Sequence, residues 1–284
     1  MSVDRREFLR LAAAASAAAA ASRQDGHGPP TRTFPVGFVS HGEPGLALDA
    51  ARGAALAAWG RALDRPRALL VVSAHWERAP LAIGTAATEP LLYDFSGFAE
   101  PLCHVKYRAP GAPVLAIDLR RRLGCEHETT RPWDHGVWVP LLHMFPEADV
   151  PVLQLSLPTG LAPDQLLEIG RRLQPLRDEG IFILASGGLV HNLARLEWRD
   201  PAAPPPAWAQ EFEAWVGETL AAWDLDALVD ARQRAPAAQL AHPTLEHWLP
   251  LLIAVGAAGA NPLITYPVQG FELGSLSRRC VQLG

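Results

Sequence analysis

Cysteine is scarce in this chain, with three residues in 284 and no pair spaced as Cys-x-x-Cys. That number and spacing argue against both a disulfide framework and a cysteine-based zinc site. Basic residues are also in deficit, because 25 Lys and Arg stand against 30 Asp and Glu, for a net charge of -5. Proteins that bind nucleic acid or anionic membranes need a basic face. We therefore expect neither partner here.

Several common catalytic motifs are missing as well. The sequence has no His-Glu-x-x-His, no Gly-x-Ser-x-Gly nucleophile elbow and no phosphate-binding loop, so the simplest arguments for a zinc protease, a serine hydrolase or a nucleotide enzyme fail. Histidine, by contrast, is abundant, with ten residues against three tyrosines. Because histidine is the commonest metal ligand and the usual proton shuttle near neutral pH, its placement is the main clue to function.

The first 25 residues have the pattern of an export signal. Arg5 and Arg6 precede an alanine-rich apolar stretch that reaches about Ala21. A charged segment followed by a short apolar one and small residues is typical of a removable signal. The paired arginines resemble the twin-arginine type, which a receptor reads. An ordinary amphipathic N-terminal helix is the alternative.

This pattern predicts the domain organisation and the location. We expect residues 1–25 to be the twin-arginine-type signal, residues 26–33 a linker, and residues 34–284 a single catalytic domain. The apolar stretch is too short to cross a bilayer comfortably, so no stable membrane association is expected. The folded protein would reach the periplasm, or be exported, through the twin-arginine machinery. Nothing in the sequence indicates an oligomeric state.

Alternating strand and helix patterns predict the fold class. Apolar runs at 68–73 and 181–185 are typical of strands buried on both faces. Helical spacing is found at 46–63, 163–176 and 243–258, with Pro243 suited to a first helical turn. We therefore predict an α/β fold, a single domain with a central mostly parallel β-sheet flanked by helices on both faces.

Three histidines follow predicted strands: His41, His75 and His191. In open α/β sheets function gathers in the loops at the carboxyl ends of the strands, so these side chains are expected to meet. His135 lies beside Asp134, whose carboxylate is placed to orient its ring.

A further histidine pair opens the last predicted helix, with His242 near its cap and His247 about one turn in. The spacing predicts a metal site whose ligands converge from distant segments. Trp76, Trp138 and Trp248 flank these histidines, and we expect them to pack in the core.

Eight segments carry a more specific signal. They are SHGEP at 40–44, SAHW at 73–76, YDFSGF at 93–98, APG at 109–111, DHGVWVPL at 134–141, PVLQLSL at 151–157, SGGLVHNL at 186–193 and HPTLEHWLPL at 242–251. In this order they resemble the class III extradiol ring-cleavage dioxygenases, in the 4,5-DOPA dioxygenase-like branch. The β subunit of protocatechuate 4,5-dioxygenase is a more distant likeness.

The resemblance implies one divalent metal ion, Zn²⁺ or Fe²⁺, held by His41, His75 and His247. In the protocatechuate branch a glutamate takes the third place, as in the two-histidine, one-carboxylate sites of non-haem iron oxygenases. Here Glu246 stands one residue before the matching His247, so the ligand and the resting metal are both open, since three histidines also suit zinc. His242 is expected to be a helix-cap residue.

The resemblance also implies the reaction. A small aromatic diol of the catechol type and O₂ would react at the ion, and the ring would open to a semialdehyde acid. His191 matches the acid/base histidine, and a neutral imidazole is suited to that role. His135 matches a histidine beside the substrate, with a purely structural role as the alternative. A zinc-dependent hydrolase using the same histidines and an inactive binding protein on this fold are the rival functions.

Overall fold

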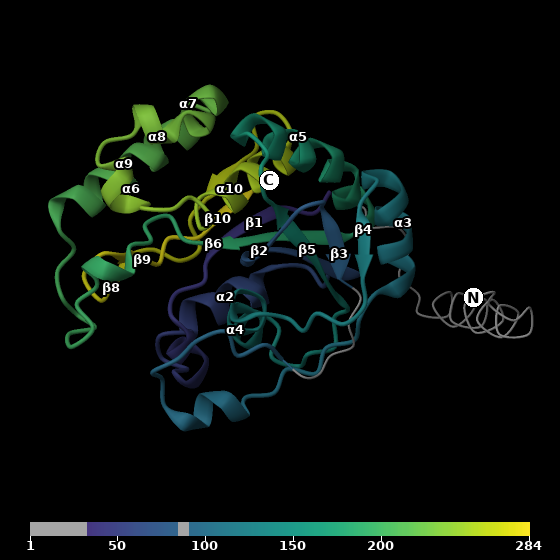
Figure 1. Cartoon of the computed structure of the whole chain (residues 1–284), viewed down its shortest axis with the longest axis horizontal. Helices are drawn as coiled ribbons and strands as arrows, with labels where there is room; N and C mark the ends of the chain where they lie inside the picture. The colour runs from purple at the N-terminus through teal and green to yellow at the C-terminus, as the bar shows by residue number, and fades with distance from the viewer. Residues whose placement is uncertain (1–32, 85–90) are drawn as a thin grey trace, which may run out of the picture. The chain divides into compact units, whose positions relative to one another are not determined.

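The computed structural model describes residues 33–84 and 91–284, so the predicted signal and nearly all of the linker lie outside the described residues. Its centre is a sheet drawn in Figure 1. The strands in spatial order are β4 (Glu126–Glu128), β3 (Ala82–Gly84), β5 (Val152–Pro158), β2 (Ala68–Arg78), β6 (Ile181–Gly187), β1 (Val36–Ser40), β10 (Val281–Leu283) and β7 (Ile264–Thr265). The four central strands β5, β2, β6 and β1 are mutually parallel, whereas β10 and β7 extend the sheet in antiparallel pairing.

Helices cover both faces of the sheet (Figure 1). In chain order they are α2 (Ala54–Ala62), α3 (Pro113–Leu123), α4 (His135–Met144), α5 (Pro163–Leu173), α6 (Ala207–Ala221), α7 (Leu225–Val229), α8 (Ala231–Arg234), α9 (Ala238–Ala241) and α10 (Leu249–Ala258). Short 3-10 turns occupy η1 (Pro44–Leu48), η2 (Glu100–His104), η3 (Gln174–Glu179) and η4 (Leu193–Arg195), and β8 (Phe271–Glu272) pairs with β9 (Leu276–Ser277).

The two sides of the sheet make two apolar cores. Along β2, Leu70 and Val72 face the core shared with α5 and α10, while Leu69 and Val71 face the core shared with α2 and α4. Successive strand residues point to opposite faces, so a continuous apolar run is what a doubly covered strand requires. The predicted fold class is therefore confirmed.

Three predicted elements differ from the structure. The helix expected over 46–63 is divided into η1 and α2, with Asp49 accepting a hydrogen bond from the backbone N–H of Arg52 in the turn between them. The strand expected to end at 73 continues as β2 to Arg78, past an irregularity between Val72 and Glu77. The last helix begins at Leu249 rather than at Pro243.

Pro250 accounts for the shorter helix. A proline inside a helix lacks the N–H that would bond four residues back, and its ring collides with that carbonyl. Pro250 stands in the first turn of α10, where its missing N–H costs nothing. The preceding residues 243–248 form turns instead, closed by the backbone N–H of Trp248 donating to Leu245 at 2.8 Å.

Candidate metal centre and active site

A cavity of about 830 Å³ lies where the carboxyl ends of β1, β2 and β6 meet the turns before α10. It is lined by the five histidines predicted to bind the metal or to act in catalysis: His41, His75, His135, His191 and His247. The sequence therefore predicted which side chains meet.

Three imidazoles face one another through the same ring atom. Nε2 of His75 lies 3.2 Å from Nε2 of His41 and 3.3 Å from Nε2 of His247. More widely, His41, His75 and His135 form one group of ligand atoms within 4.8 Å of one another, and His191, Glu246 and His247 form a second. His75 joins the two groups at the centre of the cluster.

In two of these rings, a hydrogen-bond partner of Nδ1 determines which ring nitrogen carries the proton. Ser186 Oγ donates its only proton to the carbonyl of Gly136, so at 2.9 Å it can only accept from Nδ1 of His41. Glu246 accepts from Nδ1 of His247 at 3.0 Å. With the proton on Nδ1, the Nε2 atom of a neutral imidazole carries a bare lone pair.

Asp94 acts similarly on the remaining ring. One of its oxygens lies 3.4 Å from Nδ1 of His75, and the other accepts from Nδ1 of His135 at 2.9 Å. Burial is the largest single influence and raises the pKa of Asp94. The hydrogen bonds from the side chain and backbone of His135, together with the charges of His135 and His75, outweigh burial, so the pKa is lowered overall. An ionised carboxylate only accepts hydrogen bonds, so it favours the Nδ1 proton on both rings.

These contacts are a test of whether the residues suit a metal ion. Lone pairs on His41, His75 and His247 that face one another without a proton between them repel, unless a cation lies among them. Ligands held tetrahedrally at about 2.0–2.1 Å from an ion stand about 3.3 Å apart, close to the two distances observed. Metal-bound histidines typically donate their other N–H to a carboxylate or similar acceptor. The donor set fits an ion.

Burial keeps the cluster neutral. Burial, followed by neighbouring imidazoles, lowers the pKa of His41 and of His247 well below the ordinary value, and burial with His135 lowers the pKa of His75 to about 4. Because a histidine must be unprotonated to bind a metal, the low pKa values leave these rings neutral and able to bind an ion throughout the physiological pH range.

Glycine brings His247 to the end of β6. A Cβ atom on Gly187 would lie 2.2 Å from the carbonyl oxygen of His247, far inside contact distance. That carbonyl accepts a hydrogen bond of 3.0 Å from the backbone N–H of Gly188. Ser186 and Gly187 are the last residues of β6 and Gly188 follows them, so this Ser-Gly-Gly sequence leaves room for the turn that carries His247. His247 lies in that turn and not one turn into a helix as expected.

His75 also lies differently from its prediction. It belongs to β2 itself, within the irregularity between Val72 and Glu77 that interrupts the pairing with β5, and not to a loop after the strand. Such irregularities redirect side chains next to active sites. A Cβ on Gly136 would lie 3.2 Å from the ring of His75, so the first turn of α4 packs closely against this imidazole.

The expected pairing of His135 with Asp134 is wrong. Asp134 is fully buried, accepts from Ser73 at 2.6 Å and from the amide of Gln154, and lies 3.6 Å from Arg131. Its carboxylate is therefore occupied by these three partners, beneath the site, and does not bond to His135. The orienting carboxylate of His135 is Asp94, which the sequence pattern left without a role although it lies in the YDFSGF segment.

His191 stacks on His247, with ring centroids 3.4 Å apart and planes 7° from parallel. Burial lowers the pKa of His191 to about 4, so the ring is neutral at physiological pH. His242 is a helix-cap residue as expected, but it caps the C-terminus of α9 and not the last helix, with its backbone N–H donating to Ala238. Its ring is buried behind the site, where Nε2 lies 2.8 Å from the carbonyl of Leu189. It does not line the cavity.

The aromatic wall of the cavity is formed by Phe95, Phe98 and Trp198. Trp76, Trp138 and Trp248 are buried at 4%, 0% and 2% exposure and do not line it, so their predicted core packing is confirmed. Trp198 is 51% exposed. No motif surrounds Trp198 in the sequence, and its position in a charged stretch gave no signal.

Glu43 and Glu77 complete the polar lining. Glu43 pairs with Arg52 at 2.7 Å. Burial, and then the neighbouring Glu246 carboxylate, raise the pKa of Glu77. The sequence offered no reason to select either residue for the site.

Comparison with known proteins identifies the family. The family model described as the catalytic LigB subunit of aromatic ring-opening dioxygenase matches residues 49–273. A 4,5-DOPA dioxygenase extradiol of Escherichia coli (strain K12) is 39% identical over 262 residues, covering 88% of this chain and 95% of that protein. One from Beta vulgaris is 38% identical over 235 residues, covering 79% and 87%.

A solved structure agrees with these sequence relatives. The crystal structure of an uncharacterized protein from Escherichia coli K12 superposes with a TM-score of 0.76 at 36% identity, covering 88% of this chain and 100% of that one. Together with the histidine cluster on the same sheet edge, these matches place the chain in the class III extradiol ring-cleavage dioxygenases, in the branch of the 4,5-DOPA dioxygenases.

Proposed function

We propose that this chain is a metal-dependent extradiol dioxygenase that opens the ring of a small catechol, DOPA-like or related, with O₂ to give a semialdehyde acid. The observation that carries the proposal is the convergence of the Nε2 atoms of His41, His75 and His247 in a cavity large enough for a small aromatic ring. Relatives described as 4,5-DOPA dioxygenases support the catechol class.

These three histidines would hold one divalent ion, Fe²⁺ or Zn²⁺. Imidazole ligands suit both metals. When bound, the ion supplies open positions beside each other for the catechol oxygens and for O₂, together with positive charge that stabilises the ionised diol. Iron is the metal expected for ring cleavage, because Fe(II) is the metal that activates O₂ in the two-histidine, one-carboxylate sites of non-haem oxygenases; here His247 would take the place of that carboxylate.

The remaining histidines would handle protons. His191 is neutral and lies against His247, so it can accept a proton from a catechol hydroxyl and return one as the ring opens. His135 is held by Asp94 through Nδ1, which leaves its Nε2 to accept a hydrogen bond from the diol. Phe95 and Phe98 offer aromatic faces to the substrate ring.

Metal reconstitution tests this function. Protein purified without air would be stripped, loaded with Fe²⁺ or Zn²⁺, and given a panel of catechols while O₂ consumption and yellow semialdehyde are followed. We expect the iron form to consume one O₂ per catechol. Ester or amide hydrolysis by the zinc form without O₂ uptake would favour a zinc hydrolase, and tight catechol binding without turnover in either form would indicate a binding protein.

We also propose that the protein is exported after folding, by a twin-arginine signal removed before about Asp25. The support is Arg5 and Arg6 ahead of the alanine-rich stretch. Among the described residues, no helix combines the length and apolarity needed to cross a bilayer. Replacing both arginines by lysine should leave the full-length precursor in the cytoplasm in a fractionation experiment, and continued export of that variant would contradict the proposal.

A further inference from the structure

The cavity has a one-sided charge. Its lining includes four carboxylates, Glu43, Glu77, Asp94 and Glu246, and none of the described lining residues is Lys or Arg. A lining of one sign attracts ligand groups of the opposite sign and repels groups of the same sign.

Three of these carboxylates have structural partners. Asp94 holds His75 and His135, Glu246 holds His247, and Glu43 pairs with Arg52. Arg52 is not available to pair with a substrate carboxylate, because it also forms an ion pair with Glu272 at 2.8 Å. A carboxylate-bearing substrate would thus find no unpaired positive side chain among the described residues of this wall.

Glu77 is different. It lines the cavity, its side chain is exposed, and its carboxylate makes no hydrogen bond or ion pair with any residue that the structure describes. It lies on the extended end of β2, two residues beyond His75 and on the same strand. A free carboxylate at this position is available to a group on the substrate.

The aromatic wall suits the same kind of group. Trp198 borders both this cavity and an adjoining one of about 610 Å³, and Phe98 does too. The faces of aromatic rings carry negative charge density and attract cations, with tryptophan the strongest. A substituent that extends from a catechol ring would therefore meet aromatic faces and carboxylates, a pairing found where ammonium groups are recognised.

From this lining we propose that the cavity selects catechols whose side chain ends in an ammonium group and carries no carboxylate, with Glu77 as the counter-charge. The inference rests on the proposed dioxygenase function and adds the substrate class to it. The proposal is distinguished by the order of preference that it predicts: catechols with an ammonium group are preferred over neutral catechols, and neutral catechols over those with a carboxylate.

Three substrates of similar size isolate the charge: dopamine, ethylcatechol and dihydroxyphenylpropionate. Binding is measured anaerobically on the iron-loaded protein, where no turnover occurs, and kcat/KM is measured in air. We expect dopamine to exceed the propionate by about 10-fold or more in both, a ratio that shrinks as salt is raised. DOPA, which carries both charges, should fall below dopamine.

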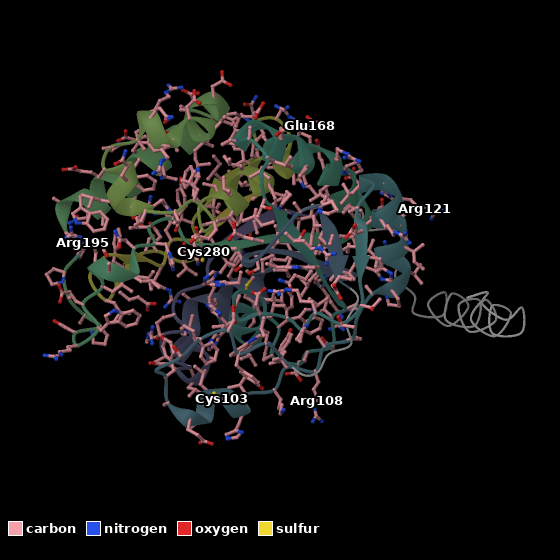
Figure 2. All side chains as sticks on the ribbon, in the orientation of Figure 1. Cys103, Arg108, Arg121, Glu168, Arg195 and Cys280 are labelled. Carbon is pink, nitrogen blue, oxygen red and sulfur yellow. The ribbon has the colours of Figure 1, made fainter. Side chains whose placement is uncertain are left out.

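Variants assign the effect to a residue. Glu77→Gln should reduce the dopamine-to-ethylcatechol ratio about 3-fold, a size suited to an exposed charge, and Glu77→Lys should bring the propionate above dopamine. Glu168→Gln is the control, since Glu168 lies on the outer surface of α5 (Figure 2), where among the described residues its ion pair is with Arg171. Its ratio should equal that of the wild type. Circular dichroism would check that each variant is folded.

The outcomes separate the two proposals. If none of the catechols is cleaved by the iron form, the dioxygenase function fails, and this inference fails with it. If catechols are cleaved but the propionate equals or exceeds dopamine, the function stands and the charge selection is wrong. If dopamine leads and Glu77→Gln leaves the ratio unchanged, the assignment to Glu77 is overturned.

Discussion

Replacing Asp94 by asparagine tests the arrangement that prepares the metal site. One carboxylate serves two rings: it accepts from Nδ1 of His135 at 2.9 Å and from the backbone N–H of the same residue at 3.1 Å, and it lies 3.4 Å from Nδ1 of His75. An amide has one acceptor oxygen and one donor NH₂. It can replace the carboxylate toward one ring only.

The side that loses the acceptor is expected to be His75. The amide oxygen would keep the two shorter contacts with His135, and the NH₂ group would then face Nδ1 of His75. That ring would accept through Nδ1 and carry its proton on Nε2, the atom that points to His41 and His247. A protonated Nε2 has no lone pair for a metal ion.

The cost follows from the contact that is lost. Nδ1 of His75 would lose a 3.4 Å contact with a carboxylate oxygen, and loss of such a partner behind a metal-binding histidine typically weakens metal binding about 10- to 100-fold. We therefore expect Asp94→Asn to bind Zn²⁺ about 10- to 100-fold more weakly than the wild type, with little change in overall fold. Turnover by the iron form should fall by at least as much.

Competition with a chromophoric chelator would measure the affinity directly, without reliance on activity. Asp118→Asn is the matched control, because Asp118 pairs with Arg122 on the exposed side of α3. Wild-type affinity in Asp94→Asn would refute the tautomer argument. Equal losses in both variants would point to a general charge effect instead.

Three further predictions follow from the same contacts. His247→Ala should empty the site, whereas Glu246→Gln should only weaken it, as measured by metal content; the reverse result would make Glu246 the third ligand. His191→Ala should retain metal and bind catechol anaerobically but turn over about 10²- to 10⁴-fold more slowly, and metal loss would make it a ligand. His242, whose pKa burial lowers to about 4 from 6.5, stays neutral in the fold while the unfolded chain binds a proton below pH 6.5. Its contribution to stability is therefore complete above pH 6.5 and declines toward pH 4, by about 1.4 kcal/mol per pH unit. In urea titrations with chelator, His242→Gln should lose about 2 kcal/mol less than the wild type between pH 7 and pH 5; equal losses would contradict this.

The parts of the site that the sequence predicted correctly follow from simple rules. Buried parallel strands are recognisable as apolar runs, and their carboxyl ends share one edge of the sheet. His41 and His191 follow such runs closely, so the order of residues along the chain was enough to predict that they meet. His75 lies near enough to its run that the wrong strand end did not matter.

The partners behind the ligands could not be predicted in the same way. Asp94 lies in a loop between β3 and α3, with no strand or helix period to place it, and only the fold brings it to His135, 41 residues later. Asp134, next to His135 in the sequence, turned out to bond beneath the site to Ser73. Two residues that are adjacent in the sequence at the start of a helix can point in different directions, so adjacency does not predict that their side chains bond.

Two differences between the predicted and the observed site share one physical cause, which is the space available to the backbone. Apolar spacing over 243–258 is compatible with a helix, yet Pro250 favours a helix that begins in its own first turn, as α10 does, over an interior position such as the one Pro140 takes in α4. Residues 243–248 then need another place, and Gly187, with no Cβ, leaves room for the carbonyl of His247 against the end of β6. The third candidate ligand thus depends on a proline and a glycine that carry no chemistry themselves. A Gly187→Ala variant would push this turn away from the sheet while leaving all the histidines in the sequence, which is why a list of ligand residues alone does not define the site.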